Sequence, residues 1–157
     1  MNAGGRRFTI VRTFDAPRAE IWRAWTDPTV AATWWHPGGM RTPPDSVAID
    51  LRTGGSFSYT MVGPDGDEHS ATGSYLEVRE PDRLAFTWGI SGDEPAEMPV
   101  ITVELTDTGD GRTEMTFHVD GVAGRPGDEG LYDGWTEAFD ILDRLVRSGD
   151  AIPQPDG

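Results

Sequence analysis

Large aromatic side chains are the residues of this sequence best suited to hold another molecule. Six of them fall on segments whose patterning predicts a buried face: Trp35, Phe57, Tyr59, Trp88, Trp135 and Phe139. Two interpretations stay open, because such rings either line a cavity for an apolar or aromatic ligand or fill the core. Tyr59 is the most informative of them, since a buried hydroxyl needs a hydrogen-bond partner and a bound ligand would be one.

Arg12 is a charged residue on a face that is otherwise apolar. Within residues 7–14 it shares that face with three apolar side chains: Phe8, Ile10 and Phe14. A guanidinium there suits bidentate recognition of a ligand carboxylate or phosphate. We favour the alternative of an internal ion pair with Glu77 or Glu104, or a strand end facing water, because charges on buried faces are usually paired.

Other common catalytic and metal-binding patterns are absent from the sequence. The chain has no cysteine and all 13 basic residues are arginine, which excludes thiolate nucleophiles, Schiff-base lysines and P-loop chemistry. The histidines lack the spacing of a metal site: His36, His69 and His118. We therefore predict no metal, no cofactor and no assignable catalytic residue. A reaction in the cavity would depend on one of four residues: Arg12, Tyr59, Glu77 or Glu104.

The net charge of the chain limits the classes of molecule that it can bind. With 27 acidic and 13 basic residues the net charge is −14 at pH 7, which argues against nucleic acid and against an anionic membrane surface. The longest apolar stretch, near residues 30–35, is far shorter than a membrane span, and no segment resembles a targeting signal. We expect a cytoplasmic protein. The sequence leaves a monomer and a homodimer equally open.

Two kinds of periodicity describe the elements that must position these residues. Apolar and polar residues alternate along seven segments, which predicts antiparallel strands at 7–14, 47–51, 57–61, 69–78, 84–88, 101–105 and 115–119. Leu131 begins an apolar stripe at helical spacing, which predicts one long C-terminal helix. Two ion pairs are expected on its polar side: Asp140 with Arg144 and Asp143 with Arg147.

Two short helices are predicted after the first strand. Asp15, followed by Pro17 in the first turn, is expected to cap the first of them. The apolar residues that anchor this helix are Ile21, Trp22 and Trp25. Asp27 repeats the cap, and the second helix is expected to run from residue 30 to 34 or 35.

One helix is too narrow to cover a sheet of this width. A helix is about 10 Å across, whereas seven strands spaced by about 4.8 Å are much wider. The sheet must therefore curl around the helix, and concave apolar surface is left for a pocket. We assign residues 1–150 to a single α+β domain and residues 151–157 to a flexible tail.

Several short motifs, taken in their order and spacing, resemble a known family. They are Phe14-Asp15-Ala16-Pro17, Ile21-Trp22, Trp25-Thr26-Asp27-Pro28, Trp34-Trp35-His36-Pro37, the run from Asp50 to Phe57, Gly73-x-Tyr75, Phe86-Thr87-Trp88 and Gly134-Trp135. Over residues 7–147 the chain resembles the SRPBCC superfamily, in the branch of activator of heat-shock-protein-90 ATPase homologues. The resemblance implies a START-like, helix-grip fold, in which a curled antiparallel sheet holds the C-terminal helix around a hydrophobic cavity. It implies no single activity.

Two positions depart from the pattern of that family. His36 stands where many members carry Gly, and Val119 stands where many carry His. His118 lies one place earlier, and by alternation it points to the opposite face of its strand. A polar group of the family pocket is therefore expected to be missing here.

The leading hypothesis is a protein that binds a small hydrophobic or aromatic molecule between sheet and helix. The predicted cavity residues are Arg12, Trp35, Phe57, Tyr59, Trp88, Phe117, Val119, Trp135 and Phe139. One alternative is a cyclase-, aromatase- or hydrolase-like enzyme that uses the same cavity. The other is a chaperone-interacting module, which is the interpretation we favour least.

Overall fold

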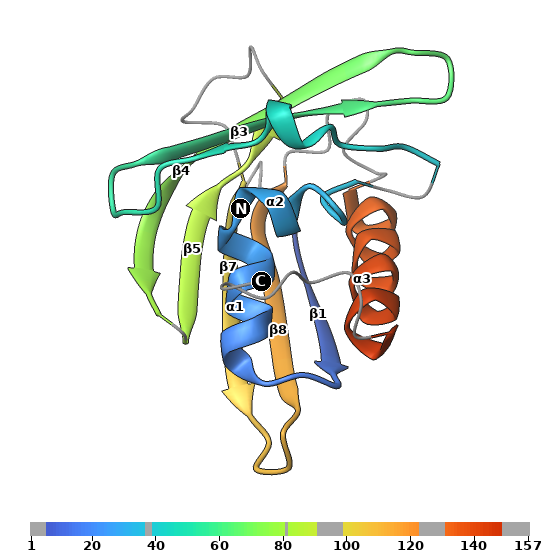
Figure 1. Ribbon diagram of the computed structural model, residues 1–157. Coiled ribbons are helices and arrows are strands. Elements are labelled where there is room, and N and C mark those ends of the chain that lie inside the picture. Colours follow the sequence, from blue (N-terminus) through green and yellow to red (C-terminus); the bar gives the residue numbers. More distant parts are fainter. Residues whose placement is uncertain (1–5, 37–38, 81, 91–98, 123–130, 149–157) are drawn as a thin grey trace.

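The computed structural model describes residues 6–36, 39–80, 82–90, 99–122 and 131–148. In chain order the elements are β1 (Arg6–Phe14), α1 (Arg18–Thr26), α2 (Pro28–Ala31), the 3-10 turn η1 (Pro44–Ser46), β2 (Ala48–Ile49), β3 (Ser56–Val62), β4 (Glu68–Arg79), β5 (Arg83–Thr87), β6 (Gly89–Ile90), β7 (Val100–Asp107), β8 (Thr113–Val122) and α3 (Leu131–Ser148). Figure 1 shows β3 and β4 bent over the steeper strands β1, β7 and β8, with the helices in the angle between them.

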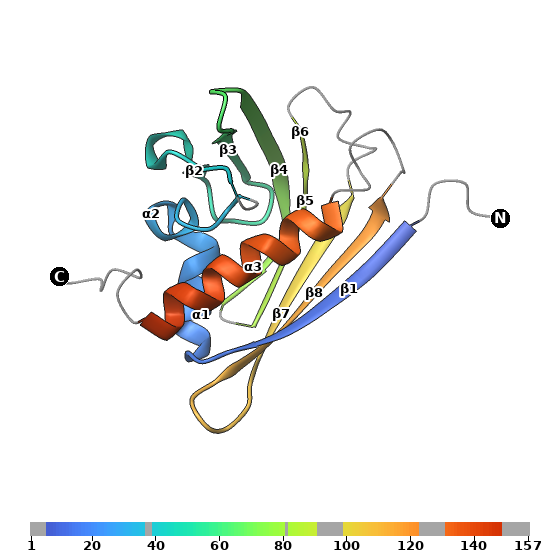
Figure 2. The same ribbon diagram turned by 90° about the vertical axis from the view of Figure 1, so that its right-hand side faces the viewer.

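The strands form one antiparallel sheet in the order β1-β8-β7-β5-β4-β3-β2, and the short β6 pairs with β4. The curled antiparallel sheet and the long C-terminal helix are thus confirmed, and so is the helix-grip architecture. β6 was not predicted as a separate strand; it follows β5 after Trp88 and returns the chain to β4 at Ala71. Figure 2 shows α3 crossing the concave side of the sheet.

The curl of the sheet has a local cause in β4. Tyr75 pairs with Phe86 but Glu77 pairs with Ala85, so Leu76 is an extra residue in the ladder. Such a bulge bends its strand and increases the twist. Gly73 permits the close packing next to it, because a Cβ there would lie 1.8 Å from a backbone oxygen of β5 and 2.7 Å from the ring of Phe57.

Trp25 of α1 lies at the centre of the core. It is 1% exposed, and its ring centroid lies 4.8–6.4 Å from those of six other aromatic residues: Trp34, Trp35, Phe86, Phe117, Trp135 and Phe139. Rings from α1, the α2 turn, β5, β8 and α3 therefore meet at one side chain. Burial of a large aromatic ring contributes strongly to stability, so this contact set joins the helices to the sheet.

The starts and ends of the short helices correct two predictions. Asp27 caps α2 as predicted, since its side chain accepts from Thr29 N at 2.9 Å. Asp15 does not cap α1; Pro17 occupies that position in an extended conformation and no side chain caps the helix. The second helix also ends at Ala31, earlier than expected, and a tighter turn carries the following Trp pair into the core.

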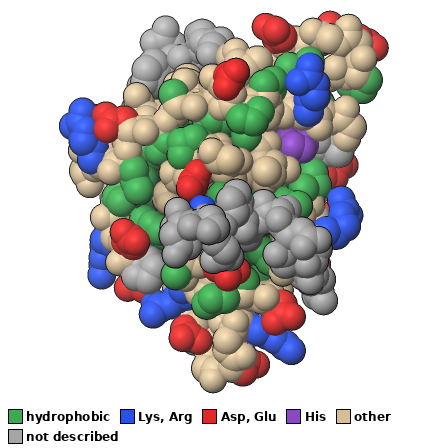
Figure 3. Space-filling view, viewed as in Figure 1, with side chains coloured by type: hydrophobic (Ala, Val, Ile, Leu, Met, Phe, Trp, Pro, Cys, Tyr) green, Lys and Arg blue, Asp and Glu red, His purple; other side chains and the backbone are tan. Residues whose placement is uncertain are grey.

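Charged side chains lie on the outside of the described structure. Figure 3 shows carboxylates and guanidiniums spread over one face between apolar side chains, with no single charged patch. On the outer side of the sheet Arg83 bridges Glu77, at 2.8 Å, and Glu104. The hydrogen bond from Arg83 lowers the pKa of the Glu77 carboxyl. Within the described residues, no helix is both long and apolar enough to cross a membrane.

Candidate functional site

A small cavity lies inside the aromatic core. Its volume is about 10 Å³, at the lower limit for one water molecule. Five residues predicted for the site line it: Trp35, Phe57, Tyr59, Trp88 and Trp135. Four residues that were not predicted for the site complete the lining: Trp25, Tyr75, Leu84 and Phe86. We call these nine residues the cavity lining. Their rings fill most of the space that the sequence led us to expect as open.

Several elements supply the cavity lining. Phe57 and Tyr59 alternate on β3 and so point to the same concave face, where Tyr75 of β4 and Phe86 of β5 meet them. Trp88 follows β5, Trp35 follows α2, and Trp135 comes from α3. The ring of Trp135 lies 6.1 Å from that of Trp88, which brings the helix onto the sheet at this point.

The other predicted cavity residues lie elsewhere. Phe117, Val119 and Phe139 are fully buried but do not line the cavity. Phe117 and Phe139 stand behind it, with ring centroids 5.0 and 5.9 Å from that of Trp135. Alternation placed these side chains on the correct face, but it cannot tell how deep in the core each one lies.

Arg12 forms an ion pair with another side chain of the protein. Its Nη2 lies 2.5 Å from Asp140 Oδ1 on α3. The predicted partners Glu77 and Glu104 are wrong, since both carboxylates contact Arg83 on the outer side of the sheet. The prediction that Asp140 pairs with Arg144 along the helix is also wrong, because Asp140 turns to β1 instead.

Tyr59 carries the one hydrogen bond within the cavity lining. Trp88 Nε1 donates to Tyr59 Oη at 2.9 Å. Tyr59 is 3% exposed, and burial raises the pKa of its phenol, while the bond from Trp88 acts in the opposite direction. The hydroxyl therefore stays protonated at neutral pH. Its own hydrogen has no acceptor among the residues that the structure describes.

Two indole N–H groups of the cavity lining are unpaired. Trp25 and Trp35 are 1% and 4% exposed, and neither Nε1 has a hydrogen-bond partner in the described part of the chain. Trp34 shows the ordinary arrangement, in which Nε1 donates to the Ala24 carbonyl at 3.0 Å. Buried polar groups are nearly always paired, so these two are exceptions, as is the buried hydroxyl of Thr136 outside the cavity lining. The surface of the cavity itself is apolar.

The backbone of Trp35 is held by a short polar chain. Thr42 Oγ1 donates to the Trp35 carbonyl at 2.8 Å and lies 3.3 Å from His36 Nδ1. Because the hydroxyl proton goes to the carbonyl, the imidazole donates to the hydroxyl. Burial lowers the pKa of His36. His36 thus supports the position of Trp35 without lining the cavity itself.

The cavity lining offers few groups that could act as an acid or a base. It contains no carboxylate and no imidazole, and its ionisable groups are the phenols of Tyr59 and Tyr75. Of the candidates considered for an enzyme, Glu77 and Glu104 lie outside the cavity and Arg12 is paired. Across the described residues, no group of three or more His, Cys, Asp or Glu side chains is arranged to hold a metal ion.

Several bacterial proteins of known structure share this fold. A protein of Mycobacterium smegmatis shares 27% identity and a TM-score of 0.74, with 89% of this chain and 90% of that one covered. A protein of Nitrosomonas europaea shares 25% identity and a TM-score of 0.77 over 92% and 96% of the two chains. One of Arthrobacter aurescens, at 24% identity and a TM-score of 0.80 over 95% and 90%, shows the same fold. No curated protein matches in sequence.

A family model also matches almost the whole of the described fold. It is the model described as activator of Hsp90 ATPase homolog 1-like protein, and it covers residues 15–147. This range runs from the end of β1 to the end of α3, so it contains every residue of the cavity lining. The fold supports a general role as a binding module and selects no ligand. The chain therefore belongs to the activator of Hsp90 ATPase homolog 1-like family.

Proposed function

We propose that the protein binds a small apolar or aromatic molecule between the sheet and α3, in the space that the cavity lining now fills. The observation that carries the proposal is a small cavity between the sheet and α3 that is lined by eight aromatic residues and one leucine.

Binding requires one ring to move, because about 10 Å³ holds no organic molecule. Trp88 is suited to this, since it is the half-buried member of a cavity lining whose other residues are buried. Its side chain makes one hydrogen bond, to Tyr59, and such a bond contributes only about 1 kcal/mol net. Trp88 is therefore the side chain that we expect a ligand to displace.

A panel of small aromatic compounds tests the proposal on the whole chain. Ligand present at 100 times its Kd stabilises a protein by about 2.7 kcal/mol, which thermal unfolding detects readily. We expect Trp88→Ala to bind compounds the size of indole more tightly than the wild type, because no ring then has to move. The control is Val11→Ala, an exposed position on β1. If no apolar aromatic compound stabilises either the wild type or Trp88→Ala, the proposal is wrong.

No specific observation favours either alternative function, an enzyme or a chaperone-interacting module. An enzyme using this cavity would have to rely on the hydroxyl of Tyr59, the one original candidate that lines it. Chaperone binding, which the family's name suggests, remains the least favoured interpretation, and a pull-down with the host chaperone tests it. Cytoplasmic location and the choice between monomer and homodimer also stay predictions.

A further inference from the structure

β1 is a long strand that has a neighbouring strand on one side only. It lies at one end of the sheet and pairs with β8 alone, without a bulge from Arg7 to Phe14. Figure 2, turned toward this edge, shows β1 in front with α3 beside it. The strand at the other end of the sheet, β2, has only two residues. Because an edge strand directs a row of backbone groups away from its neighbour, β1 is the edge to which another strand could be added.

The devices that usually protect an edge strand are absent from β1 or neutralised in it. The strand contains no proline. A charge that points inward is another such device, but the guanidinium of Arg12 is already paired with Asp140. Val11 points outward and is 54% exposed, more than any other large apolar side chain of the described structure. An exposed β-branched residue in the middle of an unprotected edge favours pairing with another strand.

The outward residues of β1 form a self-complementary series. They are Arg7, Thr9, Val11, Thr13 and, directly after the strand, Asp15, and all five are exposed. When two copies of the strand pair antiparallel with Val11 opposite Val11, each Thr9 lies opposite a Thr13 and each Arg7 opposite an Asp15. Pairs of opposite charge, of threonines and of β-branched residues are the favourable pairs across two strands.

Other symmetric registers of two such strands match less well. A two-fold axis must place residues of one face opposite each other, so the alternatives are centred on a residue near Val11. A centre at Arg12 places two guanidiniums directly opposite each other, which is destabilising. A centre at Thr9 or Ile10 makes no pair of opposite charge. The register centred on Val11 is therefore the best matched of the four.

The charges that this register brings together are available in the free chain. Among the described residues, Arg7 makes no ion pair. Asp15 Oδ1 lies 4.0 Å from Arg112 Nε, and both side chains are more than half exposed, so this contact is weak. β1 contains three arginines and no acidic residue in a chain of net charge −14. A second copy is therefore repelled less at β1 than elsewhere on the chain.

We infer that β1 is the interface at which a second copy of this chain binds, antiparallel and centred on Val11, so that the two sheets continue into each other. Such an interface uses the same residues on both copies. It lies apart from the cavity lining, since none of those nine residues belongs to β1. The inference therefore does not depend on the proposed ligand.

Sedimentation of the whole chain over a range of protein concentrations measures the dimer. We expect the wild type to dimerise, and Arg7→Asp and Asp15→Arg each to weaken the dimer about tenfold or more, because each change creates two like-charge pairs. Both positions are exposed, so both variants should keep the fold. The matched controls are Arg41→Asp and Asp65→Arg, which change the net charge equally at exposed positions away from β1.

An equimolar mixture of the Arg7→Asp and Asp15→Arg variants tests the register itself. One chain then carries carboxylates at both positions and the other carries guanidiniums at both, so each cross-strand pair of a mixed dimer again joins opposite charges. Native mass spectrometry distinguishes the mixed dimer from the two homodimers by mass. We expect the mixed dimer to predominate, whereas the two control variants should mix in statistical proportion.

Several results would overturn the inference. One is a wild-type chain that stays monomeric at every concentration. Another is a dimer that Arg7→Asp and Asp15→Arg weaken no more than the controls do, or a mixture of these variants that forms no excess of mixed dimer. Val11→Arg gives an independent check, because it places two guanidiniums opposite each other on the axis and should weaken the dimer at least as much. A dimer that survives this change would be held together by another surface.

Discussion

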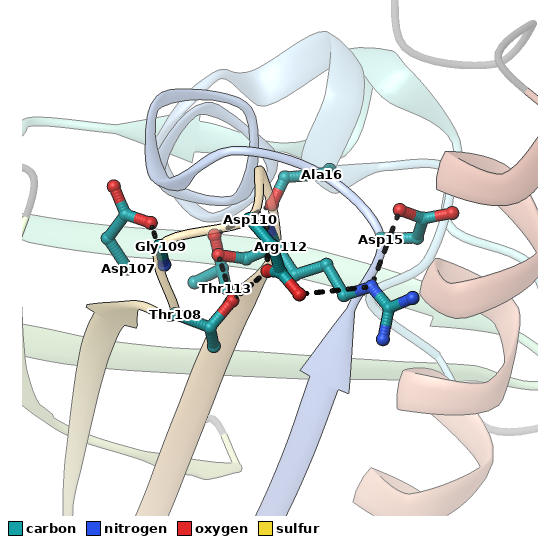
Figure 4. A network of polar contacts seen from close by, with 8 residues as sticks. All are labelled: Asp15, Ala16, Asp107, Thr108, Gly109, Asp110, Arg112 and Thr113. Carbon is teal, nitrogen blue, oxygen red and sulfur yellow. Dashed lines mark hydrogen bonds and ion pairs between the residues drawn. The ribbon is translucent and has the colours of Figure 1, made fainter.

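Two regions of this molecule treat their buried polar groups differently. At the β7–β8 hairpin, drawn in Figure 4, Thr113 is fully buried and its hydroxyl donates to the Ala16 carbonyl at 2.7 Å. The polar groups of the turn at 107–110 are also paired with one another. In the cavity lining the indole N–H groups of Trp25 and Trp35 have no partner among the described residues.

The two regions differ in how far their polar groups contribute to the stability of the folded protein. A fully paired region gains nothing from another molecule, because each of its hydrogen bonds is already made. A region with unpaired buried donors is less stable than it would be with each donor paired.

Removing the central ring should have the largest effect. Trp25→Ala deletes a side chain that contacts six other aromatic rings, so we expect the free energy of unfolding to fall by about 3–5 kcal/mol. Urea denaturation measures it. Leu51→Ala, at a 36% exposed position, is the control and should change stability by less than about 0.5 kcal/mol. A loss below about 1 kcal/mol for Trp25→Ala would show that the core is looser than described.

Removing the hydrogen bond of Thr113 should have the second largest effect on stability. Thr113→Val keeps the shape of the side chain but leaves the Ala16 carbonyl buried without its donor, at a cost of about 1–3 kcal/mol. Ligand binding should not change. Thr116→Val, on the outer side of β8, provides the matched control. Equal stability of the two variants in urea would contradict the importance given to the Thr113 bond.

Deleting a buried hydroxyl in the cavity lining should lower the free energy of unfolding by less. Tyr59→Phe also deletes a buried hydroxyl, but the donor that it leaves, Trp88 Nε1, belongs to a half-buried residue that water can reach. We expect a loss below about 1 kcal/mol, smaller than that of Thr113→Val measured under the same conditions. If Tyr59→Phe is the more destabilising of the two, the proposed division between the regions fails.

An ion pair at the edge of the sheet should contribute least to stability among these contacts. Arg12 and Asp140 have side chains 25% and 52% exposed, and exposed pairs contribute about 0.2–1 kcal/mol. A double-mutant cycle with Arg12→Gln and Asp140→Asn measures the coupling, which should shrink in high salt. A coupling above about 2 kcal/mol would mean that the pair behaves as a buried one.

Much of the fold could be predicted from the sequence, because strand alternation and one long apolar stripe determine which faces are buried. Ile101, Val103 and Leu105 gave β7 in this way, and all three are buried. The prediction that Asp15 caps α1 was wrong, because the local cap pattern does not fix where a helix starts and the folded chain has Pro17 at that position.

The site was predicted less completely, for a physical reason. Periodicity shows which face a side chain occupies, but not which residues meet across the core. Trp25 was taken as an anchor of α1, and only the folded chain brings it to Tyr59 and Trp88. The partner of Arg12 was missed for the same reason, because the crossing of α3 over β1 brings Asp140 beside it.

The smallest expected effect is a difference in the pH at which the two regions lose stability. Burial lowers the pKa of His36, which supports Trp35, from its ordinary 6.5. Below that pH the unfolded chain therefore binds more protons than the folded one, so stability rises with pH. The contribution of His36 is present above about pH 6.5 and is lost as the pH falls through its lower folded pKa. At the hairpin, the hydrogen bond from Thr108 lowers the pKa of Asp110 below 3.8, so this exposed group loses its contribution only in stronger acid.

Urea unfolding between pH 7.5 and 5 measures this separation. His36→Asn retains a donor for Thr42 and carries no titrating group, so the fall in stability across that range should become shallower than in the wild type. Thr42→Val removes the hydrogen bond but keeps the buried imidazole, so its slope should match the wild type although its stability is lower. If Thr42→Val flattens the slope as much as His36→Asn does, burial of the imidazole alone does not lower the pKa of His36 and the prediction is wrong. The region of the cavity lining would then owe its pH dependence to the polar chain that holds Trp35.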